Sequence, residues 1–337
     1  MRIGIVAPLV TPISEPQLGG SQALLADLAT GLASRGHEVS VFASSGSSIA
    51  GVRVVDTGID PDALAATMFR AGSDGARATE AAKEAFARVY AMVRDERLDV
   101  VHNHAFDAPA IELAVDLGAP VVHTLHLPPS GEIARALSTS RATVCCVSDS
   151  QADAWSRIAT VDVVLRNGVP VDRIPWSAEG GGSALFAGRL SPEKGAREAV
   201  AIAARSGIDL TVIGGAYDPD YVVDAVVIDP LPRCKLWELM ANSRVVLCPV
   251  QWDEPFGLVA AEAQAAGTPV IAFRRGALPD VVVDGETGYV VDDVEGAVRA
   301  IDIIGRIDRS ACRRHAELHL NLEDTLDQHE ALYEQLA

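Results

Sequence analysis

The chain has 337 residues, more than a single hydrophobic core usually supports, so we expect two domains. Its 28 lysine and arginine residues stand against 46 aspartate and glutamate residues, and the formal net charge is −18. Such an acidic chain repels phosphate backbones and anionic lipid, which excludes a nucleic-acid-binding module and a polybasic membrane patch. The five cysteines form no C-x-x-C pair, and no window reaches the about 18 apolar residues of a membrane span, so we expect a soluble, cytoplasmic protein.

Apolar, β-branched runs alternate with alanine-rich stretches of helical period along the whole chain. This alternation is typical of parallel sheets with crossover helices, so the expected fold class is α/β. In the first half we expect helices at 21–34 and 79–94 and strands at 3–7, 39–43, 52–55, 100–102, 121–124, 144–147 and 163–165. In the second half we expect strands at 184–187, 210–213, 226–228, 245–249, 270–273 and 288–291.

The stretch 175–183 contains proline, glycine and serine without an apolar period, which is typical of a flexible connection. We therefore expect two doubly wound, Rossmann-like domains that face a central cleft. The first domain is expected at 1–174, and the second at 184–308. Residues 175–183 form the expected hinge, and 309–337 form C-terminal helices that pack back toward the first domain. Ligands of open α/β folds bind outside the carboxyl ends of the strands, so we expect the chemistry there.

Gly19 and Gly20 lie between the first expected strand and the first expected helix. Paired glycines let a phosphate approach a helix N-terminus, where free N–H groups and the positive dipole end attract anions. An ordinary loop with Ser21 as a cap explains the same residues without a ligand. The G-x-G-x-x-G dinucleotide fingerprint is absent, which counts against a nicotinamide-dependent oxidoreductase.

Two cations follow the first expected strand of the second half. Arg189 comes directly after Gly188 and Lys194 follows five positions later, and Pro192 between them can help to begin a helix. A guanidinium fork and a compact ammonium together suit a diphosphate. The alternative is a solvated turn, but in so acidic a chain the placement of two cations at a strand end favours a phosphate site.

Two carboxylates, Glu254 and Glu262, are separated by seven residues. A helix beginning near Phe256 places Glu262 on its inner face, while Glu254 precedes the helix and can accept hydrogen bonds from ligand hydroxyls. The backbone N–H groups of Phe256, Gly257 and Leu258 are then unpaired at the helix start and offer further donors. The alternative makes Glu254 a cap and Glu262 a surface charge. However, a carboxylate among alanine, leucine and valine needs a partner.

These motifs occur in a fixed order along nearly the whole chain. The order is the Gly19-Gly20 pair, Asn167-Gly168-Val169, Gly188-Arg189-Leu190-x-x-x-Lys194-Gly195, and the E-x7-E segment from Glu254 to Glu262 with the Ala-x-Ala-x-Gly-Thr-Pro-Val run that follows it. Together they resemble the retaining glycosyltransferases of family 4 (GT4), which have the GT-B fold.

The resemblance implies that 1–174 is the acceptor-side domain and that 184–308 is the nucleotide-sugar-binding domain. It also implies a role for each motif. Arg189 and Lys194 hold the donor diphosphate and neutralise the charge that grows as the glycosidic bond breaks. Glu254 binds hydroxyls of the donor sugar, and Glu262 binds those of the ribose. The other donor-binding positions are Gly19, Gly20, Gly188, Phe256, Gly257 and Leu258. The implied mechanism is front-face: no protein nucleophile acts, the leaving phosphate oxygen takes the acceptor's proton, and the anomeric configuration is retained.

Four histidines, His102, His104, His123 and His126, lie at the ends of two expected strands. The active-site histidine of the family resembles His104, and His126 matches a second, more structural position. With Asn103, His126 marks the expected acceptor and sugar side. A zinc site is the alternative, but alternate strand positions face opposite ways and the family needs no zinc. We expect no metal and no cofactor other than the nucleotide-sugar co-substrate.

The resemblance places the nucleobase against the loop 228–233, at Pro230 and Leu231, where main-chain contacts recognise it. The side chains of this loop do not distinguish uracil from guanine as the nucleobase. The helix 79–94 mixes acidic and basic residues, unlike the basic amphipathic helices of family members that act on lipids. The triplet Asp218-Pro219-Asp220 imitates a D-x-D metal motif, but turn chemistry explains it.

We therefore expect a hexosyltransferase that uses a UDP- or GDP-sugar and a soluble small-molecule or saccharide acceptor, without a nucleic-acid or membrane partner. The alternative is a GT-B sugar-nucleotide-binding protein or epimerase without transferase activity.

Overall fold

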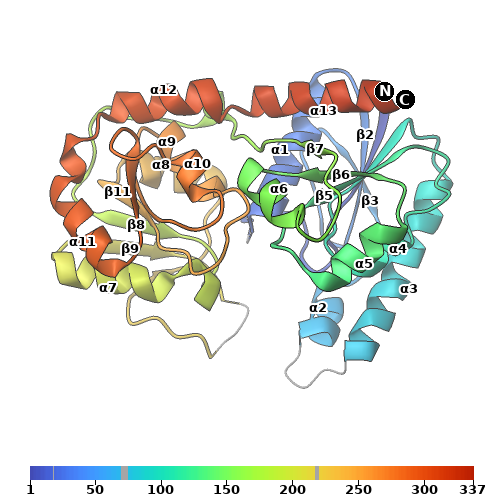
Figure 1. The fold of residues 1–337 in the computed structure, drawn as a ribbon, viewed down its shortest axis with the longest axis horizontal. Helices are drawn as coiled ribbons and strands as arrows, with labels where there is room; N and C mark the ends of the chain where they lie inside the picture. Colours follow the sequence, from blue (N-terminus) through green and yellow to red (C-terminus); the bar gives the residue numbers. More distant parts are fainter. Residues whose placement is uncertain (18, 70–74, 217–219) are drawn as a thin grey trace. The chain divides into compact units, whose positions relative to one another are not determined.

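The computed structural model describes residues 1–17, 19–69, 75–216 and 220–337, which form two compact units (Figure 1). The first unit contains Met1–Ser14, Ser21–Arg166 and Thr325–Ala337, and the second contains Glu15–Gly20 and Asn167–Asp324. The chain therefore leaves the first unit after Arg166, whereas the sequence suggested a boundary after residue 174. The domain boundaries expected from the sequence stay a prediction.

A seven-stranded parallel sheet forms the centre of the first unit, in the order β3-β2-β1-β4-β5-β6-β7. In β1, which lies inside the sheet, Ile3 pairs with Val39 on one side and with Val100 on the other. The residues of β1 after Arg2 are all buried, so both faces of the strand are covered, which explains why it is an almost continuous apolar run. The strand bounds are β1 (Arg2–Val6), β2 (Glu38–Ala43), β3 (Arg53–Asp56), β4 (Val100–Asn103), β5 (Val121–Leu125), β6 (Thr143–Cys146) and β7 (Val163–Val164).

Helices cover this sheet (Figure 1). In α3, Phe86, Val89 and Val93 recur at helical spacing and pack with Val6 and Phe42 of the sheet in one buried cluster. The helix bounds are α1 (Gly20–Ser34), α2 (Pro61–Phe69), α3 (Gly75–Arg94), α4 (Ala108–Glu112), α5 (Gly131–Thr139), α6 (Asp149–Trp155) and α13 (Leu322–Leu336). Within the described parts of both units, every helix is too short or too polar to cross a membrane.

A six-stranded parallel sheet forms the centre of the second unit, in the order β10-β9-β8-β11-β12-β13. Its strands are β8 (Ala184–Ala187), β9 (Leu210–Ile213), β10 (Val227–Ile228), β11 (Val245–Cys248), β12 (Val270–Phe273) and β13 (Gly288–Val291). Its α-helices are α7 (Ala196–Ser206), α8 (Arg233–Ala241), α9 (Leu258–Ala265), α10 (Leu278–Val281), α11 (Val294–Ile303) and α12 (Arg309–His319). Short 3-10 helices are η1 (Val171–Arg173), η2 (Pro192–Lys194) and η3 (Ile304–Arg306). The expected α/β class with two Rossmann-like sheets is confirmed.

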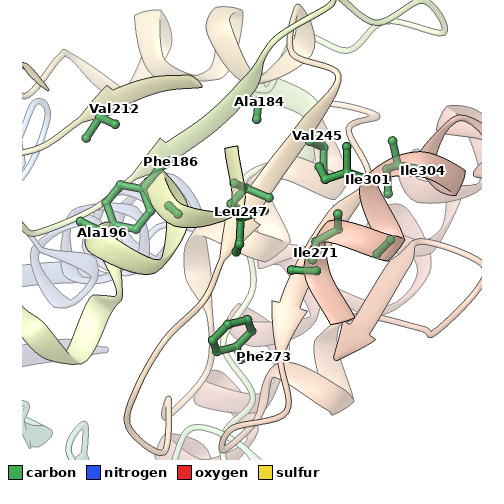
Figure 2. Packing of buried hydrophobic residues seen from close by; sticks show 14 of the residues in the cluster. Ala184, Phe186, Ala196, Val212, Val245, Leu247, Ile271, Phe273, Ile301 and Ile304 are labelled. Atoms are coloured by element: carbon green, nitrogen blue, oxygen red, sulfur yellow. The ribbon is translucent and has the colours of Figure 1, made fainter. Parts of the chain in front are cut away.

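Figure 2 shows the hydrophobic core of the second unit. Phe186 of β8 and Leu247 of β11 contribute to it from the middle of the sheet, and Ile271 and Phe273 contribute from β12. Ile301 of α11 belongs to the same buried cluster. Burial of each such side chain contributes about 1.5–3 kcal/mol, so this core holds the loops at the strand ends in fixed positions.

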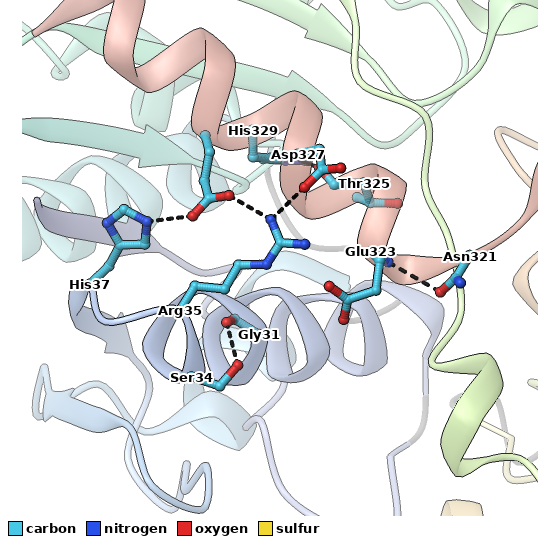
Figure 3. Close-up of polar contacts among 10 residues, drawn as sticks. Gly31, Ser34, Arg35, His37, Asn321, Glu323, Thr325, Asp327 and His329 are labelled. Carbon is cyan, nitrogen blue, oxygen red and sulfur yellow. Dashed lines mark hydrogen bonds and ion pairs between the residues drawn. The ribbon is translucent and has the colours of Figure 1, made fainter.

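The last helix, α13, is tied to the first unit by ion pairs (Figure 3). Arg35 at the end of α1 donates from Nη1 to Asp327 at 2.7 Å and to Glu330 at 2.5 Å. His37 Nε2 lies 2.7 Å from the second carboxylate oxygen of Glu330. Beside these pairs, Leu326 of α13 packs so closely on Gly31 of α1 that a Cβ there would lie 2.6 Å from its side chain.

Candidate active site

In the second unit, Lys194 and Glu254 form an ion pair that the sequence alone did not show. Lys194 ends η2, and its Nζ donates to Oε1 of Glu254 at 3.0 Å and to Oε2 at 2.7 Å. Trp252 Nε1 donates to the same Oε2 at 2.6 Å, and the ammonium lies 4.8 Å from the centroid of the Trp252 ring. Both charged side chains are largely buried, with 24 % and 12 % of their surface exposed. The two residues predicted for diphosphate and sugar therefore lie together.

Two glycines allow the loops of this pair to approach closely. Gly195 has a φ of +75°, and a Cβ there would lie 1.9 Å from the backbone oxygen of Pro249, so only glycine fits. Gly276 allows the backbone to approach Glu254 just as closely, because a Cβ there would lie 2.3 Å from the backbone oxygen of Glu254. Ala277 N also donates to that oxygen at 2.8 Å. The backbone around both charges is thereby fixed.

The second predicted cation, Arg189, lies in the β8–α7 connection with about a third of its side chain exposed. Its guanidinium forms an ion pair with Glu193, and its Nε lies 3.4 Å from Ser191 Oγ. Burial alone would raise the pKa of Glu193, but hydrogen bonds, first from Ser191, and the charge of Arg189 outweigh it and lower that pKa. Glu193 therefore stays ionised beside Arg189. The preceding Gly188 donates its N–H to the Ile213 carbonyl at 3.0 Å.

Glu262 is almost fully buried in α9, with 3 % of its surface exposed. Arg233 donates to its Oε1 from Nη2 at 2.7 Å and from Nε at 3.1 Å, and Trp237 Nε1 donates to the same oxygen at 2.9 Å. The carboxylate is thus a buried charge with a partner, and the surface-charge alternative is wrong. Sequence reasoning missed Arg233 and Trp237 as its partners. The only signal was that a carboxylate on an apolar helix requires a donor.

The start of α9 presents the predicted backbone amides. Gly257, the N-cap, has a φ of +95°, and a Cβ there would lie 2.6 Å from the Leu278 side chain. The amides of Ala260 and Ala261 donate to the Gly257 carbonyl at 3.0 and 3.1 Å. The amides of Phe256, Gly257 and Leu258 precede these, so they have no hydrogen-bond acceptor within the helix itself.

The remaining donor-side positions lie in loops of the second unit. Gly20 is counted with the second unit although it is the first residue of α1, and a Cβ on it would lie 3.6 Å from the Leu258 side chain. Pro230 and Leu231 are half-buried in the β10–α8 connection, just before Arg233. Leu18 and the Asp218-Pro219 part of the predicted turn lie outside the described residues.

In the first unit, His104 follows β4 and lies among other histidines. Its Nδ1 lies 2.9 Å from His126 Nε2, and its Nε2 is buried and has no hydrogen-bond partner within the described part of the chain. The His102 ring lies 4.0 Å from the His104 ring. Burial, followed by the charges of His102 and His126, holds the pKa of His104 well below its usual value. His104 is therefore a neutral ring at pH 7.

His102 connects this cluster to the C-terminal helix. Its Nδ1 lies 2.6 Å from the Tyr333 hydroxyl, and its Nε2 lies 2.6 Å from Thr124 Oγ1. Tyr333 and His329 both come from α13, and the His329 ring lies 5.5 Å from that of His102. Sequence reasoning missed Tyr333, because 231 positions separate it from His102.

Asn103 is completely buried and bonded within the fold. Its Oδ1 accepts from Ala105 N at 3.1 Å, and its Nδ2 donates to the Ala105 carbonyl at 3.2 Å and to His123 Nδ1 at 3.1 Å. Its predicted place on the acceptor side stays a prediction.

Cys248, at the end of β11 near Lys194 and Glu254, provides no thiolate nucleophile. It is buried, and that burial, together with the charge of Glu254, raises the pKa of its thiol to about 12.

Two family models match the chain one after the other. The model described as Glycosyltransferase Family 4 matches residues 18–173, and the model described as Glycosyl transferases group 1 matches residues 175–314. A D-inositol 3-phosphate glycosyltransferase from Arthrobacter sp. (strain FB24) is 30% identical over 94% of this chain and 90% of its own. A glycogen synthase from Mycobacterium tuberculosis is 29% identical over 94% of this chain and 88% of its own.

Solved structures show the same fold. Sucrose-phosphate synthase from Thermosynechococcus elongatus matches with a TM-score of 0.82 at 18% identity, covering 100% of this chain and 99% of that one. HepE from Anabaena, solved with UDP and glucose, matches with a TM-score of 0.77 at 18% identity, covering 100% of both chains.

The fold is GT-B, and the protein is a glycosyltransferase that uses a nucleotide-sugar donor. The chain belongs to family 4 of the glycosyltransferases, whose members are retaining hexosyltransferases, as the sequence motifs indicated.

Proposed function

We propose that the chain transfers a hexosyl group from a UDP- or GDP-sugar to a hydroxyl of a small-molecule or saccharide acceptor. The observation that carries this proposal is the pair of Lys194 and Glu254, buried beside the start of α9 with Arg189 in the neighbouring connection. A cation for phosphate and a carboxylate for sugar hydroxyls are there held in direct contact.

Lys194 has the chemistry to hold the diphosphate. An ammonium has three donors, and two of them face the oxygens of Glu254. The third can donate to a phosphate oxygen while Glu254 keeps the side chain in place. Together with the fork of Arg189, it would stabilise the negative charge that collects on the departing nucleotide.

The two glutamates keep acceptor capacity for hydroxyl groups. A carboxylate offers about four lone-pair sites, and Glu254 uses three of them for Lys194 and Trp252. The remaining site, on Oε1, suits a donor-sugar hydroxyl. In Glu262, the three bonds given above from Arg233 and Trp237, its donors among the described residues, all go to Oε1, so Oε2 is the oxygen that would accept from the ribose hydroxyls.

In the proposed step, the acceptor oxygen forms a bond to the anomeric carbon on the face from which the nucleotide leaves. The bond from that carbon to the phosphate oxygen breaks, and the same phosphate oxygen takes the acceptor's proton. The nucleoside diphosphate and a glycoside of retained configuration result. Neutral His104, whose Nε2 has no partner among the residues that the structure describes, would offer a hydrogen bond and would not act as an acid.

The donor is tested with a panel of nucleotide sugars. UDP-glucose heads the panel because the HepE structure contains UDP and glucose, and GDP-mannose, ADP-glucose and NAD complete it. A ligand that binds only the folded state raises the melting temperature, so thermal shifts with EDTA present identify the donor. Nucleoside diphosphate release with an acceptor panel then measures transfer.

We expect one UDP- or GDP-sugar to raise the melting temperature without metal, and Lys194→Met to abolish the shift. A shift with NAD alone would contradict the proposal. Donor binding without transfer to any hydroxyl acceptor would favour the alternative of a sugar-nucleotide-binding protein.

A further inference from the structure

A pocket of about 360 Å³ lies in the first unit, at the carboxyl ends of β4 and β5. Its volume falls within the range of small-molecule sites. Apolar side chains from several helices line it, including Ala82 of α3, Ile111 of α4 and Ile133 of α5. The polar lining includes His123, Asp107 and Glu132, which face a single ligand space.

His123 offers a hydrogen-bond donor to this pocket. The backbone of Ala105 fixes the orientation of the Asn103 amide, so its NH₂ group donates to Nδ1 of His123. Burial lowers the pKa of His123 to about 4, so the ring is neutral at pH 7 and its proton lies on Nε2. That nitrogen is buried and has no partner among the described residues. An acceptor oxygen on a ligand would satisfy it.

The two carboxylates make the pocket unfavourable for anions. Asp107 is the N-cap of α4, but its side chain makes no capping hydrogen bond. Burial, and then the charge of Glu132, raise the pKa of Asp107 to about 6, so one more negative charge nearby would be costly. The described lining contains no lysine or arginine that would pair with a phosphate.

The pocket also adjoins the predicted active-site histidine. His126 lines it, and Nε2 of His126 lies 2.9 Å from Nδ1 of His104. We propose that this pocket binds the acceptor, and that the acceptor is an uncharged molecule with hydroxyl groups and an apolar face, not a phosphate ester. The inference rests on the proposed transferase function and specifies its acceptor class.

The test compares neutral and phosphorylated members of three matched pairs. The probes are myo-inositol and D-myo-inositol 3-phosphate, glucose and glucose 6-phosphate, and phenyl β-glucoside and its 6-phosphate. Saturation-transfer NMR and calorimetric titration measure their binding to the full chain. We expect the neutral phenyl glucoside to bind, and to bind about tenfold or more tightly than its phosphate because two like charges face the latter.

Two charge-reversal variants then locate the binding. Glu132→Lys changes an exposed carboxylate of the lining, so folding should be kept, and we expect the preference for the neutral member to fall several-fold. Glu112→Lys makes the same change on α4 at an exposed position outside the lining, and should leave the preference unchanged.

Three results would overturn the inference: equal or tighter binding of the phosphorylated members, no binding by any probe, or identical preferences in the two variants. Donor thermal shifts on the same samples separate the two proposals. If the donor binds but the probes give one of these three results, only the inference about the acceptor fails. If no nucleotide sugar binds, the proposed function fails with it.

Discussion

The ion pair of Lys194 and Glu254 allows stability and catalysis to be separated by a double-mutant cycle. We consider Lys194→Met, Glu254→Gln and the double variant. At the observed 2.7 Å the attraction is about 6 kcal/mol for an effective dielectric constant of about 20. Desolvation of two largely buried ions offsets most of it, so we expect a coupling free energy of about 1–3 kcal/mol.

Each single variant leaves one buried charge without its main partner, so each should unfold at lower urea concentration than the wild type. The double variant should recover part of that loss because neither charge remains. Activity should behave differently. All three variants should lose transfer by about 100-fold or more, because the phosphate cation or the sugar acceptor is missing.

Urea unfolding followed by tryptophan fluorescence measures the coupling, and nucleoside diphosphate release measures transfer. The matched control is the exposed pair of Lys235 and Glu238, whose coupling should be close to zero because solvent screens both charges. A coupling as small as this control, or transfer restored in the double variant, would refute the reasoning.

Two further predictions concern the backbone and the buried histidines. Gly195→Ala should lower the free energy of unfolding by about 3 kcal/mol or more and weaken donor binding, since a Cβ would lie 1.9 Å from the Pro249 carbonyl oxygen. Gly207→Ala, at a similar φ of +67° in open space, should lower it by only about 1–2 kcal/mol. Equal melting temperatures of the two variants would contradict this. Burial lowers the pKa of His329 in the folded state to about 4, whereas in the unfolded chain it is about 6.5. As the pH falls from 6.5 toward 4, the unfolded chain takes up a proton that the folded protein does not, so the free energy of unfolding decreases. At about pH 5.5 the loss is about 1.4 kcal/mol, so His329→Gln should flatten the pH dependence of unfolding by this amount, and a pH dependence equal to that of the wild type would contradict this.

The fold was predictable because its signals are local. Parallel strands buried on both faces appear as apolar runs, and those at 100–102 and 245–249 lie where the structure has β4 and β11. The short helix α5 was not anticipated, although Ile133, Ala136 and Leu137 recur at helical spacing, because its nine residues are fewer than the about 11–18 over which a helical period is assessed.

The site was predictable in its residue types but not in its pairing. The seven-residue spacing indicated that Glu262 faces inward, which its burial confirms. Its partner Arg233 is 29 positions away on another helix, and Tyr333 reaches His102 across 231 positions. Such pairs depend on how helices pack on the sheet, which no local pattern specifies. The roles of the predicted residues in binding and catalysis stay predictions.

The most direct test of the central claim is the crystal structure of the protein with the nucleotide sugar identified by thermal shift. We predict that Lys194 Nζ lies about 3 Å from a diphosphate oxygen and that Glu262 Oε2 accepts from the ribose. A complex in which the diphosphate lies away from Lys194, with the Lys194–Glu254 pair unchanged and without ligand contacts, would contradict the account.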